Sequence, residues 1–142
     1  MRRQFEFAVL VIVIAVLAVL VMKALERTRS DLEEAGVQTE AAAIRVQLME
    51  RLAHRATFGG PLPDSDNPVE WIRMPPNNYL GALDRPPAEK SSWYYNKATR
   101  ELVYALYDGR QARFRLSRTA GASGARGVMG GIGLLRIDDD RQ

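Results

Sequence analysis

Apolar residues run without interruption from Phe7 to Met22, and a single acid, Glu6, stands at the start of this run. Twelve of the residues in the run are Val, Ile, Leu or Phe. Each of these contributes roughly 0.3–0.6 kcal/mol to membrane insertion, so together they contribute roughly 4–7 kcal/mol. A helix over residues 5–22 is roughly 27 Å long at ~1.5 Å of rise per residue, close to the ~30 Å hydrocarbon core of a bilayer. The pattern predicts a membrane-spanning helix half over residues 1–22.

A cleaved secretory signal is the main alternative for this segment. Such signals have a shorter apolar region that is followed by small residues at a cleavage site. Here the run is followed by Lys23-Ala24-Leu25-Glu26-Arg27, so we expect an uncleaved anchor. Basic residues flank the run on both sides, and charge alone does not decide its orientation. The short N-terminal tail and the globular remainder favour an N-terminus in the cytoplasm and the bulk of the chain on the opposite side.

Residues 23–57 continue the helix as an amphipathic half. Apolar positions three or four residues apart form a stripe on one face: Val37, Ala41, Ile44, Leu48 and Leu52. The solvent side is predicted to consist of Glu33, Glu34, Glu40, Arg45, Glu50 and Arg51. No proline occurs before Pro61, and Gly59-Gly60 precede it, so we predict one helix from about residue 3 to about residue 57. Its stripe requires a packing partner in the rest of the chain.

Turn-forming residues dominate the segment 58–91, which we predict to be an ordered loop with a short helical turn starting at Pro68. In residues 92–118 the apolar pattern changes to a period of two, typical of an antiparallel meander. Residues 119–142 are predicted to be a glycine-rich, flexible tail in which 134–137 are a candidate last strand. The predicted fold class is α+β, a long N-terminal helix packed on a small antiparallel sheet of three or four strands.

Composition narrows the possible functions. The chain has 142 residues, a formal net charge of +3 and a sequence pI of about 9.5. This charge is too small to indicate nucleic-acid binding by itself. There are no cysteines and one histidine, His54, which we expect on the surface. Disulfides, thiolate catalysis and multi-histidine metal sites are therefore excluded.

Few side chains offer the chemistry of a site. Glu6 is the strongest candidate, because an acid at membrane depth is costly and usually has a partner. The oxygen-rich loop 64–67 resembles a calcium ligand set only in composition, and such loops are more often turns and caps, so no metal site is predicted. No nucleophile has a base near it in the sequence. We therefore predict no catalytic residue and no cofactor, and expect that the chain is not an enzyme.

A candidate basic surface follows the second predicted strand. It consists of Arg110, Arg113, Arg115 and Arg118. Arginines in such a cluster can bind the phosphates of a nucleic acid. Charges on an edge strand also prevent strand-on-strand aggregation, and we favour this explanation. A nucleic-acid partner is therefore not expected.

Two motifs are specific enough to compare with known families. The first runs from Asn67-Pro68-Val69 to Pro76-Asn77-Asn78-Tyr79-Leu80-Gly81. The second is Ser92-Trp93-Tyr94-Tyr95-Asn96 followed by Arg100-Glu101-Leu102-Val103-Tyr104. The first is similar to a segment of pilin-like proteins of the mannose-sensitive haemagglutinin pilus type, and the second resembles a hairpin common among pseudopilins and minor pilins. With the helix, the resemblance to type IV pilins and type II secretion pseudopilins covers about residues 4–117.

The resemblance implies a non-enzymatic subunit of a type IV pilus or type II secretion system that assembles by helix–helix packing. The partners it implies are other pilin or pseudopilin subunits, an inner-membrane assembly platform and the lipid bilayer. It also implies a single pass through the inner membrane, with the bulk of the chain in the periplasm or incorporated in a pilus or pseudopilus.

The same resemblance assigns assembly roles to Phe5 and Glu6. In pilins a glycine precedes the phenylalanine that becomes the methylated mature end, and a glutamate a few residues later pairs with a neighbouring subunit's terminal amine. Here Gln4 stands where the glycine would be, and Glu6 directly follows Phe5. The proline usual in the family's membrane helix is absent from residues 1–60. These departures favour a membrane-resident accessory subunit over a major filament subunit.

Two other functions are compatible with the sequence. A membrane-tethered periplasmic adaptor or sensor domain would dimerise through residues 23–57 as a coiled coil, but these residues lack a strict seven-residue repeat. A DNA-binding minor pilin would use the basic surface of residues 110–118.

Overall fold

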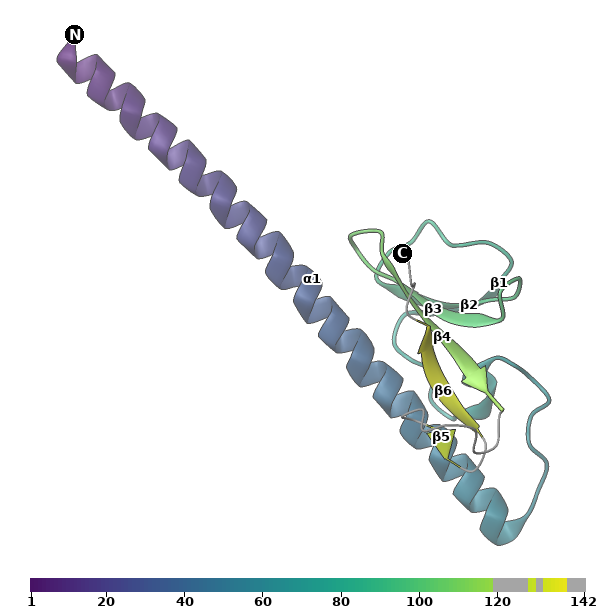
Figure 1. Ribbon diagram of the computed structural model, residues 1–142. Helices are drawn as coiled ribbons and strands as arrows, with labels where there is room; N and C mark the ends of the chain where they lie inside the picture. The colour runs from purple at the N-terminus through teal and green to yellow at the C-terminus, as the bar shows by residue number, and fades with distance from the viewer. Residues whose placement is uncertain (119–127, 130–131, 138–142) are drawn as a thin grey trace.

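The computed structural model describes residues 1–118, 128–129 and 132–137 of the chain. Within these ranges it has one long helix, α1 (Arg2–Phe58), a short 3₁₀ helix, η1 (Pro68–Trp71), and one six-stranded sheet. The sheet lies beside the C-terminal part of α1, and the N-terminal part of the helix extends far beyond it (Figure 1). The strands are β1 (Tyr79–Leu83), β2 (Ser92–Asn96), β3 (Glu101–Ala105), β4 (Gln111–Ser117), β5 (Val128–Met129) and β6 (Ile132–Ile137).

α1 is continuous because nothing in its sequence interrupts it. Proline does not occur before Pro61, and the helix passes through Gly36 without a break. It ends where Gly59 and Gly60 take positive φ angles of 72° and 114°, a backbone conformation that glycine adopts readily. The prediction of one helix with no break near Met22 is confirmed.

The sheet has the strand order β1-β2-β3-β4-β6-β5. Strands β2, β3 and β4 form the predicted antiparallel meander, in which Trp93 faces Tyr104 and Leu102 faces Phe114. Asn96 closes the turn between β2 and β3, because its side-chain oxygen accepts two backbone N–H hydrogen bonds. β6 pairs with β4, so the predicted last strand is also confirmed.

The prediction of three or four strands was too low, and one pairing is parallel. β1 lies inside the segment 58–91, which was predicted to be a loop, and it pairs in parallel with β2. Burial alternates along this short strand, but Leu80 stands at an exposed position and Gly81, at a φ of 99°, at a half-buried one, so its sequence shows no period-two alternation of apolar and polar residues. β1 forms by hydrogen bonding to the backbone of β2, and the sequence of β1 itself gives no sign of this pairing. The α+β fold class is confirmed, and the other pairings are antiparallel.

Only parts of the predicted tail, residues 119–142, lie among the described residues. β5 pairs antiparallel with β6, and its two residues sit in a glycine-rich stretch that gave no strand signal. The prediction of flexibility falls mainly on residues 119–127, 130–131 and 138–142, which lie outside the described residues.

The core lies between one face of α1 and the side of the sheet that faces it. The predicted stripe is confirmed, because Val37, Ala41, Ile44 and Leu48 are at most 2% exposed, while Leu52 is half-buried. The residues that these four pack with are Trp71, Trp93, Leu102, Leu106, Ala112, Phe114, Leu116 and Leu134.

Trp93 is an aromatic centre of this core. Its ring centroid lies 5.1 Å from that of Tyr104 in an edge-to-face arrangement and 5.6 Å from that of Phe114. Such pairs add about 0.5–1.5 kcal/mol to the burial of the rings. The motif at residues 92–104 therefore supplies both the hairpin and the surface on which α1 rests.

Leu48→Ala should lower the free energy of unfolding by about 2–5 kcal/mol, because it leaves a cavity under α1. Val46→Ala, at a position that is 62% exposed on the same helix, should change it by less than about 0.5 kcal/mol. Urea unfolding of the full chain in detergent micelles, followed by near-ultraviolet circular dichroism, measures both. Equal effects of the two substitutions would contradict the burial of this face.

Candidate functional site

The first half of α1 has no packing partner among the described residues. Its most apolar 18-residue window is 0% buried, and Ile12, Leu17 and Leu20 are 62%, 55% and 57% exposed. Monomeric soluble proteins rarely expose apolar patches larger than a few hundred Å². This helix is long and apolar enough to cross a membrane near the N-terminus, properties that it shares with signal sequences. An apolar surface of this extent is unfavourable in water.

Phe5 and Glu6 lie in the exposed beginning of α1. Phe5 is 71% exposed, and Glu6 is exposed as well. Glu6 follows Arg3 and Arg2 by three and four residues, so the three side chains occupy neighbouring positions on the helix surface. In the part of the chain that the structure describes, Glu6 has neither a hydrogen bond nor an ion pair. Its role in assembly stays a prediction.

The arginines of the candidate basic surface lie in three separate places. Arg110, in the turn after β3, contacts the carboxylate of Asp108 at 2.7 Å. Arg118, which follows β4, lies 3.5 Å from a carboxylate oxygen of both Asp64 and Asp66. Arg110 is thus paired with an acid of its own turn, and Arg118 with two acids of the loop 64–67.

The third place is the side of the sheet that faces away from α1, where Arg113 and Arg115 flank Glu101. Glu101 is 4% exposed, and its Oε1 accepts a hydrogen bond from Nη2 of Arg115 at 2.8 Å. Its Oε2 lies 3.9 Å from Nη1 of Arg113. Because a buried carboxylate is costly without a counter-charge, both guanidinium groups are drawn toward it. The expectation that this surface does not bind a nucleic acid is untested and stays a prediction.

Glu33 joins α1 to the end of the sheet. Its Oε1 accepts hydrogen bonds from the Ser91 hydroxyl at 2.7 Å and the Tyr104 hydroxyl at 3.2 Å. The backbone N–H of Tyr107 donates to both carboxylate oxygens, at 3.2 and 3.0 Å. One carboxylate thus holds the residue before β2, a side chain of β3 and the chain after β3. Hydrogen bonds to charged groups are worth about 1.5–3 kcal/mol each.

The surroundings of Glu33 change the acidity of Tyr104. Burial, followed by the nearby Glu33 carboxylate, raises the pKa of Tyr104 to about 12. The Tyr104 hydroxyl therefore keeps its proton and donates it to Glu33 throughout the physiological pH range. Beside it, the Arg29 guanidinium lies 4.0 Å from the centroid of the Tyr107 ring, a cation–π contact that adds a further link to α1.

Further polar contacts between α1 and the globular part continue along the helix. Each connects a side chain that flanks the apolar stripe with a strand or loop. They are Ser30 with Asp108 (3.0 Å), Glu34 with Arg136 (2.5 Å), Glu40 with the Trp93 indole N–H, Arg45 with the Leu134 carbonyl (3.0 Å), and Gln47 with the Met74 N–H and carbonyl (3.1 and 3.2 Å). Rotation of α1 about its own axis would break contacts on both sides of the stripe.

The prediction that Glu33, Glu34, Glu40 and Arg45 form the solvent side of the helix was wrong. All four are half-buried and bound to the sheet or to residues that adjoin it. They flank the stripe closely enough for long polar side chains to reach the sheet beside it. The only sequence signal was their spacing of three or four residues from stripe positions, because their partners lie far away in the chain.

The face of α1 opposite the sheet, here called the outer face, carries no charge over more than twenty residues. It consists of Leu25, Thr28, Leu32, Ala35, Gly36, Thr39, Ala42, Ala43 and Val46. Thr28 and Thr39 donate their hydroxyl groups to the helix's own carbonyls at 3.0 Å, so the hydroxyls need no other partner. A Cβ at Gly36 would meet open space. Small side chains of this kind permit close approach of another helix.

The loop 64–67 serves structural roles. Asn67 caps η1, because its Oδ1 accepts a hydrogen bond from the Val69 N–H at 3.1 Å. Its Nδ2 donates to the Tyr79 hydroxyl at 3.1 Å, which brings the two ends of the motif at 67–81 together. Among the described residues, no group of three or more His, Asp or Glu side chains is arranged to hold a metal ion.

Comparison of the chain with models of known protein families, with curated proteins and with solved structures finds no match. The arrangement of a long, apolar N-terminal helix and a small sheet on its second half is compatible with a pilin-like fold (Figure 1).

Alkaline pH should destabilise the protein through Tyr104. A tyrosine in the unfolded chain loses its proton near pH 10, whereas folded Tyr104 keeps it until about pH 12. Its contribution to stability is therefore complete below pH 10 and is lost as the pH rises toward 12. Tyr104→Phe should make the fall in the free energy of unfolding over this range shallower, as measured by urea unfolding at a series of pH values.

Tyr107→Phe is the matched control for this experiment. It removes a hydroxyl that forms no hydrogen bond within the described residues, and it leaves the Tyr107 N–H bonded to Glu33. The pH dependence of this variant should match that of the unmodified chain. A fall of the same steepness in Tyr104→Phe and the unmodified chain would contradict the effect of Glu33 on Tyr104.

Proposed function

We propose that this chain is a non-enzymatic, pilin-like subunit of a type IV pilus or type II secretion system. It acts by assembly, in which α1 packs against the helices of other subunits in the membrane or in a filament core. The observation that carries the proposal is the unbroken helix. Its first half is apolar and has no packing partner among the described residues, and its second half is held to a sheet. The motifs at residues 67–81 and 92–104 support it through their resemblance to pilin-like proteins.

The distribution of side chains around α1 supports an assembly role. Its stripe is occupied by the sheet, so a coiled-coil adaptor could not use Val37, Ile44 and Leu48 as a dimer seam. The outer face remains available from Leu25 to Val46 and follows directly on the apolar half. Apolar surface gives little driving force between helices within lipid, so close packing and polar pairs decide which helices associate. The small residues of the outer face and the carboxylate of Glu6 supply these two elements.

The proposed location is the inner membrane, with a single pass, the N-terminus in the cytoplasm and the sheet in the periplasm. The helix continues past Met22 into the part that is held to the sheet, and no small-residue cleavage site interrupts it. In this proposal an intact anchor carries the globular part on a helical extension of the membrane segment. Partners would be other pilin or pseudopilin subunits and an inner-membrane assembly platform.

Cross-linking from the outer face tests the assembly role. The chain has no cysteine, so Ala35→Cys can be labelled selectively with a thiol-reactive benzophenone. In membranes of the native host, this probe should form adducts with the N-terminal helix of another pilin-type subunit or of a second copy, identified by mass spectrometry. Ala88→Cys, an exposed alanine in the loop before β2, is the matched control and should give few such adducts. Equal yields from both positions would count against the proposal.

Substitution of Glu6 tests the polar pair. Interhelical polar contacts in lipid are worth about 1–2 kcal/mol, so Glu6→Gln should weaken association with other pilin-type subunits roughly five- to thirtyfold. Co-purification from detergent-solubilised membranes measures the loss. Glu26→Gln, at an exposed position just beyond the apolar run, should leave recovery unchanged. Unchanged recovery with Glu6→Gln would remove this residue from the mechanism.

A further inference from the structure

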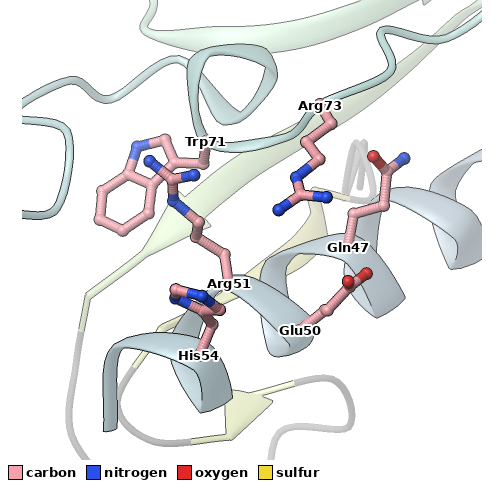
Figure 2. A pocket seen from close by; sticks show the side chains of 6 residues that line it. All are labelled: Gln47, Glu50, Arg51, His54, Trp71 and Arg73. Carbon is pink, nitrogen blue, oxygen red and sulfur yellow. The ribbon is translucent and has the colours of Figure 1, made fainter. Parts of the chain in front are cut away.

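A small pocket near the C-terminal end of α1 collects three basic side chains. Its volume is about 100 Å³, and its lining residues are Gln47, Glu50, Arg51, His54, Trp71 and Arg73. Figure 2 shows Arg51 rising from α1 toward the Trp71 ring, and Arg73 reaching back toward the helix from the segment that follows η1. Two guanidinium groups thus approach the same space from opposite sides.

Among the described residues, these basic groups lack the acidic partners that Arg110, Arg113, Arg115 and Arg118 have. Within the described part of the chain, neither Arg51 nor Arg73 forms a hydrogen bond or an ion pair, and His54 makes only a ring contact. Glu50 is the one acid among the described lining residues, so the two guanidinium groups of this lining exceed its carboxylates by one charge. The imidazole of His54 adds an N–H donor in either tautomer. The pocket therefore offers hydrogen-bond donors and positive charge to a group from outside.

The walls of the pocket are held in place before any ligand binds. Gln47 bonds both the N–H and the carbonyl of Met74, at 3.1 and 3.2 Å, which fixes the backbone next to Arg73. Trp71 is 3% exposed, and its indole N–H donates to the Ser65 carbonyl at 2.9 Å. Contacts of this kind lower the entropic cost of binding, because only the two arginine side chains have to be ordered.

The size of the pocket limits what it accepts. A cavity of ~150 Å³ holds benzene, and sites for metabolites or cofactors usually measure about 300–1,000 Å³. This pocket holds one small group and not a whole nucleotide or cofactor. The planar forks of guanidinium groups match the oxygen atoms of phosphates and carboxylates. We propose that the pocket binds one oxyanion group, a phosphate or a carboxylate, between Arg51 and Arg73.

The position of the pocket bears on the source of this group. Arg51 follows Met22 by 29 residues, which is roughly 43 Å along α1. If the apolar half spans a membrane as proposed, lipid headgroups of that membrane lie too far away. The sources are then free phosphate or a carboxylate of another protein chain. The binding chemistry of the pocket does not itself depend on the assembly role.

Titration of the ¹⁵N-labelled full chain in detergent micelles tests the site. The chain has two tryptophans, so its indole N–H groups give two signals, and Trp71→Phe identifies that of Trp71. Inorganic phosphate and acetate are added separately at constant ionic strength, kept with sodium chloride. The Trp71 signal should shift until it saturates, while that of Trp93, which is 0% exposed, should stay in place.

Variants show whether the pocket itself is responsible. Arg51→Gln and Arg73→Gln should each weaken binding at least about tenfold, because each removes charge-assisted hydrogen bonds. Arg55→Gln, an exposed position on the same turns of α1 outside the pocket, should leave the affinity unchanged. An unmoved Trp93 signal in each variant shows that the fold is intact.

The outcomes distinguish the sources of the oxyanion. Saturation with phosphate alone assigns the pocket to phosphate, and saturation with acetate alone assigns it to carboxylates. Saturation with both assigns it to both kinds of oxyanion. The proposal is overturned if sodium chloride, added in place of phosphate or acetate, shifts the Trp71 signal equally. It is also overturned if saturable binding survives both Arg51→Gln and Arg73→Gln. These results are independent of the cross-links from Ala35, so the oxyanion site and the assembly role can fail separately.

Discussion

The packing of the α1 stripe on the sheet is the interaction on which the rest of the structure depends. Four helix side chains, Val37, Ala41, Ile44 and Leu48, carry it, and each buried Val, Leu or Ile side chain contributes about 1.5–3 kcal/mol. A helix of 57 residues is far longer than the sheet that it contacts, so this short interface orients the whole rod. The apolar half and the outer face acquire defined directions relative to the sheet only because the stripe is buried.

Polar contacts complement this packing by selecting one position of the helix. A stripe of small and branched apolar residues tolerates a slide of one helical turn, ~5.4 Å, with only a modest loss of burial. Glu33 and Glu40 do not tolerate such a slide, because each reaches its hydrogen-bond donors on and beside the sheet in one position of the helix only. Half-buried carboxylates cost desolvation energy, and we attribute to them a gain in specificity of the helix–sheet arrangement.

The parts of the fold that local patterns encode were predictable from the sequence. The apolar run, the stripe and the period-two strands depend on neighbouring residues, and the structure bears them out. β1 was missed because it depends on a pairing with β2, and the bonds of Glu33 were missed because Ser91 and Tyr107 lie far along the chain. The dispersion of the arginines was hidden for the same reason. Arg113 and Arg115 share one side of β4, whereas Arg110 and Arg118 lie beyond its ends, and Glu101, Asp64 and Asp66, which pair with three of the four, lie elsewhere in the chain.

The contact between α1 and the globular part that lies nearest the N-terminus also determines how far the sheet would stand from a membrane. Arg29, which contacts Tyr107, follows Met22 by seven residues, or roughly 10 Å of helix. The polar layer on each side of a bilayer is only about 5–7 Å thick, so a sheet carried in this way would stand above the lipid with water beneath it. Because the rod has no hinge, a tilt of ~20°, average for membrane helices, would sweep Phe58 sideways by roughly 18 Å and carry the whole sheet with it. Lateral reach would then come from leaning of the entire molecule and not from bending.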